Sequence, residues 1–246
     1  MAEPAPQRPP VIVTTSWDDG HVKDESLAEL LHDRGLAGTF YIAPRNVELP
    51  EASRLGTRGL RALSDEFEIG GHTLTHLRLP ALSRADAKRE IRDGKAVLED
   101  VLGSPVDSFC YPGGAYSEGH PIMVAEAGFS GARTVDRWVT TPSSRYELGT
   151  TVHAYRHWVD HRRVLALARG NVHLATRWFL NWEELAIALF DRVAAHGGVY
   201  HLWGHSWEVD ARGDWQRLRR VLSHISGRAG VEYLTNGQLF QRVVQA

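Results

Sequence analysis

The sequence predicts a single α/β domain built on a parallel sheet, and three observations support this prediction. Short β-branched or aromatic segments alternate with segments of helical periodicity along most of the chain. This alternation is typical of βαβ units, whose strands run parallel. The length of 246 residues suits one α/β barrel, and 43% hydrophobic with 24% charged residues is a normal globular composition. The alternation alone is compatible with a barrel or an open sheet.

The first half of the chain contains four predicted strands and three predicted helices. Leucines at helical spacing between Leu27 and Leu31 indicate the first helix, and Gly35 ends it. Ser83 with Asp86 three residues later indicates the start of a longer helix, because a serine cap satisfies free backbone amides. The predicted strands lie at 11–16, 39–43, 67–70 and 106–110, and the helices at 27–34, 60–63 and 83–102.

The second half repeats the alternation around a less regular middle. Residues 134–177 hold aromatic and histidine residues without a clear period, so we expect loops there. Asn181 is the expected cap of a strong helix, and Asn236 opens a terminal one. The remaining predicted elements are helices at 122–127, 182–196 and 215–226, and strands at 128–132, 199–203 and 231–234.

Charge, cysteine content and the N-terminus restrict the possible partners. The formal net charge is −2, so no general basic field favours nucleic acid. The single cysteine, Cys110, excludes an internal disulfide and a cysteine zinc site. The proline-rich residues 1–10 predict a disordered lead-in, followed by one domain over residues 11–246. Without a signal peptide or a membrane-spanning segment in the given chain, we expect a cytoplasmic protein.

Two adjacent carboxylates follow the first predicted strand. Asp18 and Asp19 lie where α/β folds place active sites, at the carboxyl end of a buried strand. Successive side chains face different ways, so one carboxylate can bind a cation while the other accepts a proton. Taken alone, these residues are better explained by an ordinary Asp-Gly turn.

A pair of histidines follows the third predicted strand. His72 and His76 are four residues apart, and on a helical turn two such side chains share one face. Two imidazoles together with the Asp19 carboxylate form a ligand set for a divalent ion, with a position left open for water. Two polar loop histidines are the simpler alternative.

Two further segments end predicted strands. The first is the Pro-Gly-Gly turn after Tyr111, where Tyr111, Pro112 and Gly113 are candidates for substrate contact. The second contains His201, Trp203 and His205, which share one side if the strand extends that far. A histidine there can transfer a proton near neutral pH, and Trp203 can contact substrate.

The order of these motifs resembles that of the polysaccharide deacetylases, also called NodB-homology domains or carbohydrate esterase family four. The matching segments are Thr15 to Gly20, His72 to His76, Tyr111 to Gly114, and the late His205. The resemblance extends from about residue 11 to the C-terminus. It implies a distorted (β/α) barrel of seven or so parallel strands, fewer than the usual eight.

The resemblance also implies a role for each motif residue. Asp19, His72 and His76 correspond to the ligands of one divalent ion, with Zn²⁺ expected and Co²⁺, Ni²⁺ or Fe²⁺ compatible with the same donors. Asp18 corresponds to the general base, and His205 to the general acid, with His201 as its alternative. The implied activity is hydrolysis of the N-acetyl group of an amino sugar in a polysaccharide, an oligosaccharide or a sugar conjugate.

The chain departs from the family pattern at two places. Cys110 occupies the position of an arginine that usually pairs with the base, and Arg133 from the next strand is a candidate replacement. Two pairs are candidates for the Asp/Trp segment that supports the catalytic histidine: Asp136 with Trp138, and Trp158 with Asp160. Two other functions remain open: a deformylase or other amidase acting on a lipid- or nucleotide-linked sugar, and a carbohydrate-binding protein without catalysis.

Overall fold

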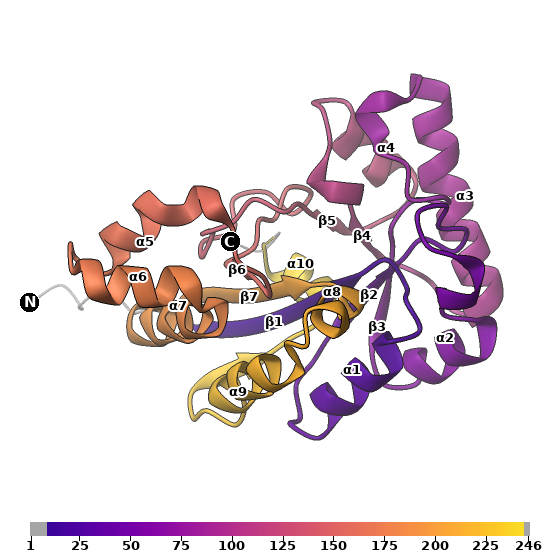
Figure 1. The fold of residues 1–246 in the computed structure, drawn as a ribbon. Coiled ribbons are helices and arrows are strands. Elements are labelled where there is room, and N and C mark those ends of the chain that lie inside the picture. The colour runs from indigo at the N-terminus through magenta and orange to yellow at the C-terminus, as the bar shows by residue number, and fades with distance from the viewer. Residues whose placement is uncertain (1–8, 244–246) are drawn as a thin grey trace, which may run out of the picture.

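The computed structural model describes residues 9–243, and it shows a curled half-barrel of parallel strands (Figure 1). The strand order is β5-β4-β3-β2-β1-β7-β6, with β8 paired to β1 beside this path. This arrangement confirms the predicted distorted barrel with seven or so parallel strands. The strands are β1 (Val11–Asp18), β2 (Thr39–Ile42), β3 (Glu68–Gly71), β4 (Ser108–Cys110), β5 (Gly131–Arg133), β6 (Val152–His153), β7 (Gly198–Gly204) and β8 (Val231–Tyr233).

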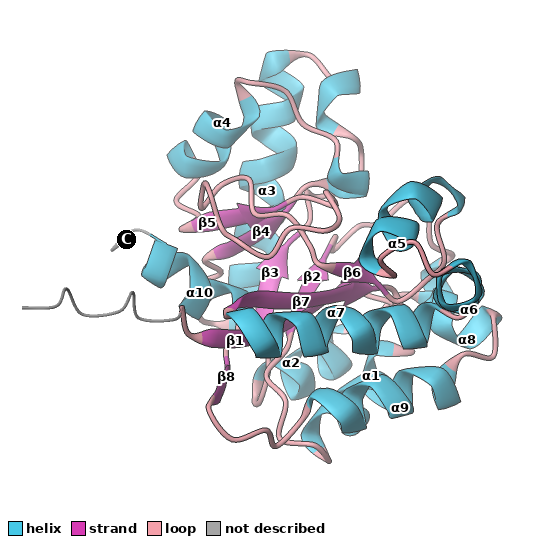
Figure 2. Cartoon of the chain, turned by 90° about the vertical axis from the view of Figure 1, so that its left-hand side faces the viewer, coloured by secondary structure: helices cyan, strands magenta, loops and turns pink. Residues whose placement is uncertain are grey.

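Helices surround the sheet on its outer side (Figure 2). Most strands are followed by a helix, as the alternation of the sequence predicts, and α5 to α7 form a run of three helices between β6 and β7. None of the helices in the described part of the chain combines the length and apolar character needed to cross a bilayer. The helices are α1 (Asp24–His32), α2 (Thr57–Ser64), α3 (Arg84–Leu102), α4 (His120–Glu126), α5 (His161–Leu167), α6 (Val172–Leu180), α7 (Trp182–His196), α8 (Ser206–Ala211), α9 (Trp215–Ile225) and α10 (Asn236–Val243).

Outside the middle segment the predicted elements are present in the predicted order, and the structure adds one helix, α8, between β7 and α9. Ser83 caps α3 as expected, because its hydroxyl accepts a hydrogen bond from the Asp86 amide. Asn181 precedes α7, but its side chain donates to the carbonyl of Arg177 instead of capping the helix. The predicted lead-in over residues 1–10 lies outside the described residues, apart from Pro9 and Pro10.

The expectation of a loop-rich segment at 134–177 is wrong in its second part. This region contains the short strand β6 and two helices, α5 and α6. Its buried apolar positions are few and small, such as Val164, Ala168 and Ala175, while larger apolar residues there are exposed. Exposed apolar residues such as Trp158, Val159 and Leu165 lie where a surface helix is normally polar, so the sequence pattern does not indicate these helices clearly.

A buried polar network fills the interior of the half-barrel below the strand ends. The guanidinium of Arg133 donates to the hydroxyl of Thr14, the side-chain oxygen of Asn236 and the carbonyl of Gly149. It also lies 2.9 Å from Nδ1 of His201. Buried polar groups need such partners, because an unpaired group retains its full desolvation cost. The network therefore stabilises the lower interior and leaves the upper rim, at the carboxyl ends of the strands, for the site.

Candidate active site

The carboxyl end of β1 carries the two adjacent aspartates. Asp18 is the last residue of β1, and Asp19 turns away with a φ of 88°. Such a φ is uncommon for a residue other than glycine and costs on the order of 1–3 kcal/mol, so it persists only where the surroundings enforce it. This turn directs the two buried carboxylates differently, as the sequence predicts.

The histidine pair lies in a loop directly after β3. Thr73 and His76 have φ values of 62° and 70°, so His72 to His76 is not the helical turn considered from the spacing. The loop nevertheless brings the two imidazole rings within 4.8 Å of each other, centroid to centroid. The imidazoles of His72 and His76 are therefore close together as predicted, but on a loop instead of a helical turn.

Helix α3 braces this loop from behind. The carboxylate of Glu90 accepts hydrogen bonds from both the amide and the hydroxyl of Thr75, at 2.9 and 2.8 Å. Gly94 lets α3 approach closely, because a Cβ there would lie 2.8 Å from the Thr73 carbonyl oxygen and nearer still to other loop backbone atoms. The positions of the two imidazoles therefore depend on a rigid helix.

The three predicted ligand atoms converge. Oδ1 of Asp19 lies 3.8 Å from Nε2 of His72 and 3.1 Å from Nε2 of His76. Ligands at 2.0–2.1 Å around a tetrahedral ion lie roughly 3.3 Å apart, which matches this spacing. Apart from the ion-pair contact with His76, the buried Oδ1 of Asp19 has no hydrogen-bond partner among the described residues. An orphaned carboxylate oxygen facing two imidazole nitrogens fits a divalent cation.

Neighbouring groups hold each of these donors in place. Nδ1 of His72 donates to the carbonyl oxygen of Cys110 at 2.7 Å, and Nδ1 of His76 donates to Glu48 at 3.0 Å. Both contacts leave Nε2 facing the cluster, the usual arrangement around ligating histidines. Trp207 donates to Oδ2 of Asp19 at 2.8 Å. Burial lowers the pKa of His72 to about 3, so its imidazole is neutral and its Nε2 lone pair is available.

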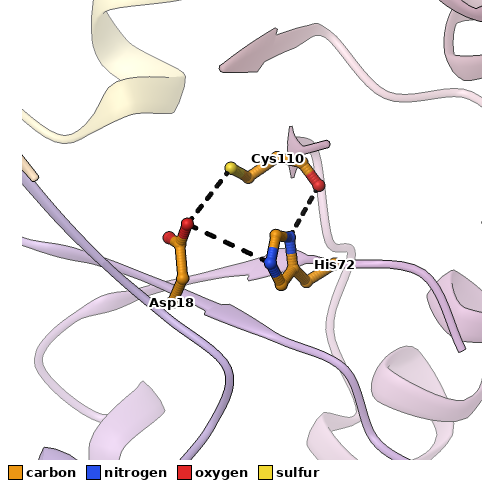
Figure 3. Close-up of side chains that lie close together, drawn as sticks. All are labelled: Asp18, His72 and Cys110. Carbon is orange, nitrogen blue, oxygen red and sulfur yellow. Dashed lines mark hydrogen bonds and ion pairs between the residues drawn. The ribbon is translucent and has the colours of Figure 1, made fainter. Parts of the chain in front are cut away.

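Cys110 lies close to the same site but is a hydrogen-bond donor (Figure 3). Its thiol donates to Oδ2 of Asp18 at 3.4 Å, and that oxygen is 4.0 Å from Nε2 of His72. Burial and the charge of Asp18 raise the pKa of the Cys110 thiol well above its ordinary value. Because metal binding requires a thiolate, Asp19, His72 and His76 form the better ligand set.

Asp18 is held by neutral donors. Its Oδ2 accepts a hydrogen bond from Nε1 of Trp203 at 2.7 Å in addition to the thiol contact, and its Oδ1 has no partner among the residues described. Burial raises the pKa of Asp18 to about 6, against the opposing effect of His205. Arg133 is committed to the interior network and gives Asp18 no hydrogen bond, so the expected arginine replacement is wrong.

His205 lies on the opposite side of the cluster, just beyond β7. Its Nε2 is 4.0 Å from Oδ2 of Asp19, and its Nδ1 donates to Oε2 of Glu208 at 2.8 Å. Burial acts to lower the pKa of His205, but Glu208 and the two aspartates outweigh it and raise the pKa to about 9. His205 is therefore protonated near neutral pH.

His201 lies deeper in the half-barrel. Its Nδ1 is shared between Thr14 and Arg133, and its Nε2 is 3.1 Å from the Ser16 hydroxyl. Burial and the charge of Arg133 lower its pKa well below the ordinary value. With both ring nitrogens occupied, His201 is a poorer candidate for the acid than His205.

The turn after β4 differs from the expectation for substrate contact. Tyr111 is fully buried, its hydroxyl donates to the Tyr146 carbonyl, and its amide donates to the Arg133 carbonyl. The buried ring and the occupied amide argue against a sugar or oxyanion contact by Tyr111. Pro112 is buried as well, whereas Gly113 is exposed at the rim. Trp203 contacts the predicted base, which makes it a positioning residue for Asp18.

Two residues of the site were not singled out from the sequence. Glu208 lies three residues after His205, and Oε2 of Glu208 is also 3.2 Å from Nε2 of His153. The ring of His153 packs on Trp203 at 4.0 Å between centroids, which links this carboxylate to the base. The three-residue spacing of His205 and Glu208 is the sequence feature that could indicate their contact. It does so only if a helix begins at Ser206, as α8 does. Neither Trp138 nor Trp158 marks the support of His205, which comes from Glu208.

Replacing Glu208 with glutamine is expected to shift the basic limb of the pH–rate profile to lower pH. The substitution removes the negative charge beside His205, so the pKa of His205 falls, by an amount of about 1–3 units for a charge at this distance. The acid form is then lost at lower pH. A pH–rate profile with metal content measured in parallel tests this. A lower rate with an unmoved basic limb would contradict a role through His205.

Solved structures with a similar fold include proteins described as deacetylases. The chain resembles a Mycobacterium smegmatis protein assigned to the polysaccharide deacetylases, with a TM-score of 0.68 and 15% identity over 98% of this chain and 93% of that one. It also resembles the chitin deacetylase of Colletotrichum lindemuthianum, with a TM-score of 0.59 and 17% identity over 94% and 87% of the two chains. At these identities the likeness establishes the fold.

Other matches are partial. The alignment with the Streptococcus pyogenes deacetylase PplD has a TM-score of 0.51 and 18% identity, over 55% of this chain and 61% of that chain. For proteins of Bacillus anthracis and Bacillus cereus the match spans 44% of their length. A comparison with curated proteins found no match. The model of the family described as "Polysaccharide deacetylase" matches residues 5–132, which is more than half of the chain. The protein belongs to the polysaccharide deacetylase family.

Proposed function

We propose that this family member is a metal-dependent hydrolase that removes the N-acetyl group from an amino sugar. The observation that carries the proposal is the convergence of Asp19, His72 and His76, with the orphaned Oδ1 of Asp19 between the two imidazoles. Two imidazoles and one carboxylate suit Zn²⁺, and also Co²⁺, Ni²⁺ or Fe²⁺. A divalent ion there supplies Lewis acidity to the acyl carbonyl and to an attacking water.

The protein's own groups then divide the proton transfers. Asp18, with an unpartnered oxygen and a pKa of about 6, is ionised at neutral pH and accepts the proton of the attacking water. His205, with a pKa of about 9, is protonated and donates to the departing amine. Trp203 and Glu208 fix the orientations of these two groups. Two titratable groups with opposite protonation states are what acid–base hydrolysis requires.

The presence of Asp18, the candidate base, favours a catalytic function over carbohydrate binding alone. Burying a carboxylate with an unpaired oxygen is costly, and binding a sugar does not need it. Asp18 has such an oxygen beside a complete ligand set. The geometry gives no reason to prefer formyl over acetyl, so acetate and formate release are separate outcomes of the same assay.

The test is acetate release from N-acetylated amino sugars and chitin oligosaccharides, with formylated analogues in parallel. We expect acetate release that a chelator abolishes and that added Zn²⁺ or Co²⁺ restores. Formate release alone would identify a deformylase. Tight sugar binding by the metal-loaded protein without release of either acid would contradict the hydrolase and favour the binding protein.

A further inference from the structure

The segment from residue 156 to residue 180 forms a helical hairpin on the outside of the molecule. It comprises α5 and α6, which pack against each other and, through α6, against α7 (Figures 1 and 2). It is anchored from within, because Asp160 forms two hydrogen bonds with Arg137 and Asn171 caps α6. Its inner side buries Val164 and Ala175. The hairpin therefore has a packed inner face that holds it on the domain.

The outer side of the hairpin is unusually apolar. Trp158 is 64% exposed, Val159 74% and Val172 64%, although such side chains are normally covered. Leu165 and Leu180 are exposed on the same hairpin. Val172 and Leu180 are eight residues apart and therefore lie on one face of α6. Among the described residues, the other exposed large apolar side chains are Val22, Val47 and Leu77, in the loops after β1, β2 and β3, and Ile122 on α4.

The same hairpin is basic within an acidic protein. Residues 156–180 contain five arginines and one aspartate, a net charge of +4, whereas the whole chain carries −2 and the remainder therefore −6. Asp160 is buried and paired, so it does not offset the outer charge. Arg162 and Arg169 have no carboxylate partner in the part of the chain that the structure describes, and both are exposed. Exposed apolar side chains and unpaired arginines thus occur together on this hairpin.

We propose that this hairpin docks on an anionic lipid bilayer surface. Exposed tryptophan, valine and leucine can enter the headgroup boundary, while arginines bind the negative headgroups, as in interfacial amphipathic helices. A second copy of the chain fits less well, because a symmetric contact through this face would place Arg162 and Arg169 near the same arginines of the copy. A soluble polyanion would leave the exposed apolar residues unexplained.

The hairpin is also close to the candidate active site along the chain. β6 ends at His153, whose ring packs on Trp203 beside Asp18, and the hairpin begins three residues later. The surface itself is independent of the proposed function, because it rests on residues outside the ligand set and the acid–base groups.

The test is co-sedimentation of the full chain with vesicles. We expect binding to vesicles of phosphatidylglycerol and phosphatidylcholine in equal amounts, weakened by salt, and little binding to phosphatidylcholine alone. The double variant Arg162→Gln with Arg169→Gln is expected to bind about 30-fold more weakly, since each arginine near an anionic surface contributes about fivefold. The double variant Val159→Ser with Leu165→Ser is also expected to lose binding.

Matched controls use exposed residues of the same type elsewhere. Arg58→Gln with Arg219→Gln, on α2 and α9, and Ile122→Ser, on α4, are expected to leave vesicle binding unchanged. Circular dichroism confirms that each variant is folded. The proposal would be overturned by equal binding to both vesicle types, or by an equal loss of binding with the control pair. It would also be overturned if no vesicle binding were found and the chain instead formed a concentration-dependent dimer that Val159→Ser and Leu165→Ser abolish.

Discussion

Replacing Asp18 with asparagine is expected to reduce deacetylation by about 10²–10⁴-fold while leaving the bound metal in place. General base catalysis by one positioned group contributes about this factor. Asparagine keeps an oxygen that can accept the Trp203 hydrogen bond, but it cannot accept the proton of the attacking water. The loss is therefore expected in kcat, with metal content near that of the parent.

Asp24→Asn is the matched control for this substitution. Asp24 is a buried aspartate that accepts a hydrogen bond from the Ser206 hydroxyl at 2.5 Å. Burial raises the pKa of Asp24 to about 8, so its side chain is largely neutral at pH 7 and asparagine mimics it. We expect this variant to retain most of the activity. An Asp18→Asn enzyme with the parental rate would remove Asp18 from the role of base.

Removing a histidine ligand is expected to abolish activity through loss of the metal. His72→Ala and His76→Ala each remove one of the three converging donor atoms, which are Oδ1 of Asp19 and Nε2 of the two histidines. Loss of an outer partner of a ligand typically costs 10–100-fold in metal affinity, and loss of a ligand itself is expected to cost more than about 100-fold. Elemental analysis and acetate release should fall together, in contrast with the Asp18 variant.

The two histidines differ in burial, so the effect of losing a ligand can be separated from an effect on folding. His72 is buried, so its replacement can also destabilise the fold, whereas His76 lies nearer the surface with a side chain 12% exposed. His196→Ala, on the exposed end of α7, is expected to change neither metal content nor rate. Added Zn²⁺ should raise the melting temperature of the parent and not of the His76 variant, because only a protein with an intact site gains stability from binding. Full metal binding by both histidine variants would exclude this ligand set.

Much of the site was accessible from the sequence because its residues follow predicted strands. Asp18 ends β1, Asp19 follows it and His72 follows β3, and parallel strands bring their carboxyl ends to one rim. His205 follows β7 in the same way. The alternation of strands and helices was sufficient to predict this common location. The spacing of His72 and His76 suggested a helical turn, whereas the real loop uses left-handed backbone at His76 that periodicity does not reveal.

The supporting contacts depend on tertiary packing and were not predictable. Glu208 reaches His205 only because α8 begins at Ser206, immediately after the strand. Trp203 donates to Asp18 across the β1–β7 pair, which requires the register that places Ser16 opposite Trp203. Arg133 lies at the end of a strand like the site residues, but its side chain points into the interior network. Its position in the sequence therefore wrongly suggested a contact with the base, Asp18. The hairpin of α5 and α6 escaped prediction because its outer face is apolar where a surface helix is normally polar.

The most direct test of the account is a crystal structure of the protein grown with Zn²⁺, with the ion located by anomalous scattering at the zinc edge. The account predicts one strong peak at roughly 2.0–2.1 Å from Oδ1 of Asp19, Nε2 of His72 and Nε2 of His76, with Asp18 beside it and not bound to it. A peak bound instead by Asp18 and the sulfur of Cys110, or the absence of any peak among these side chains, would contradict it.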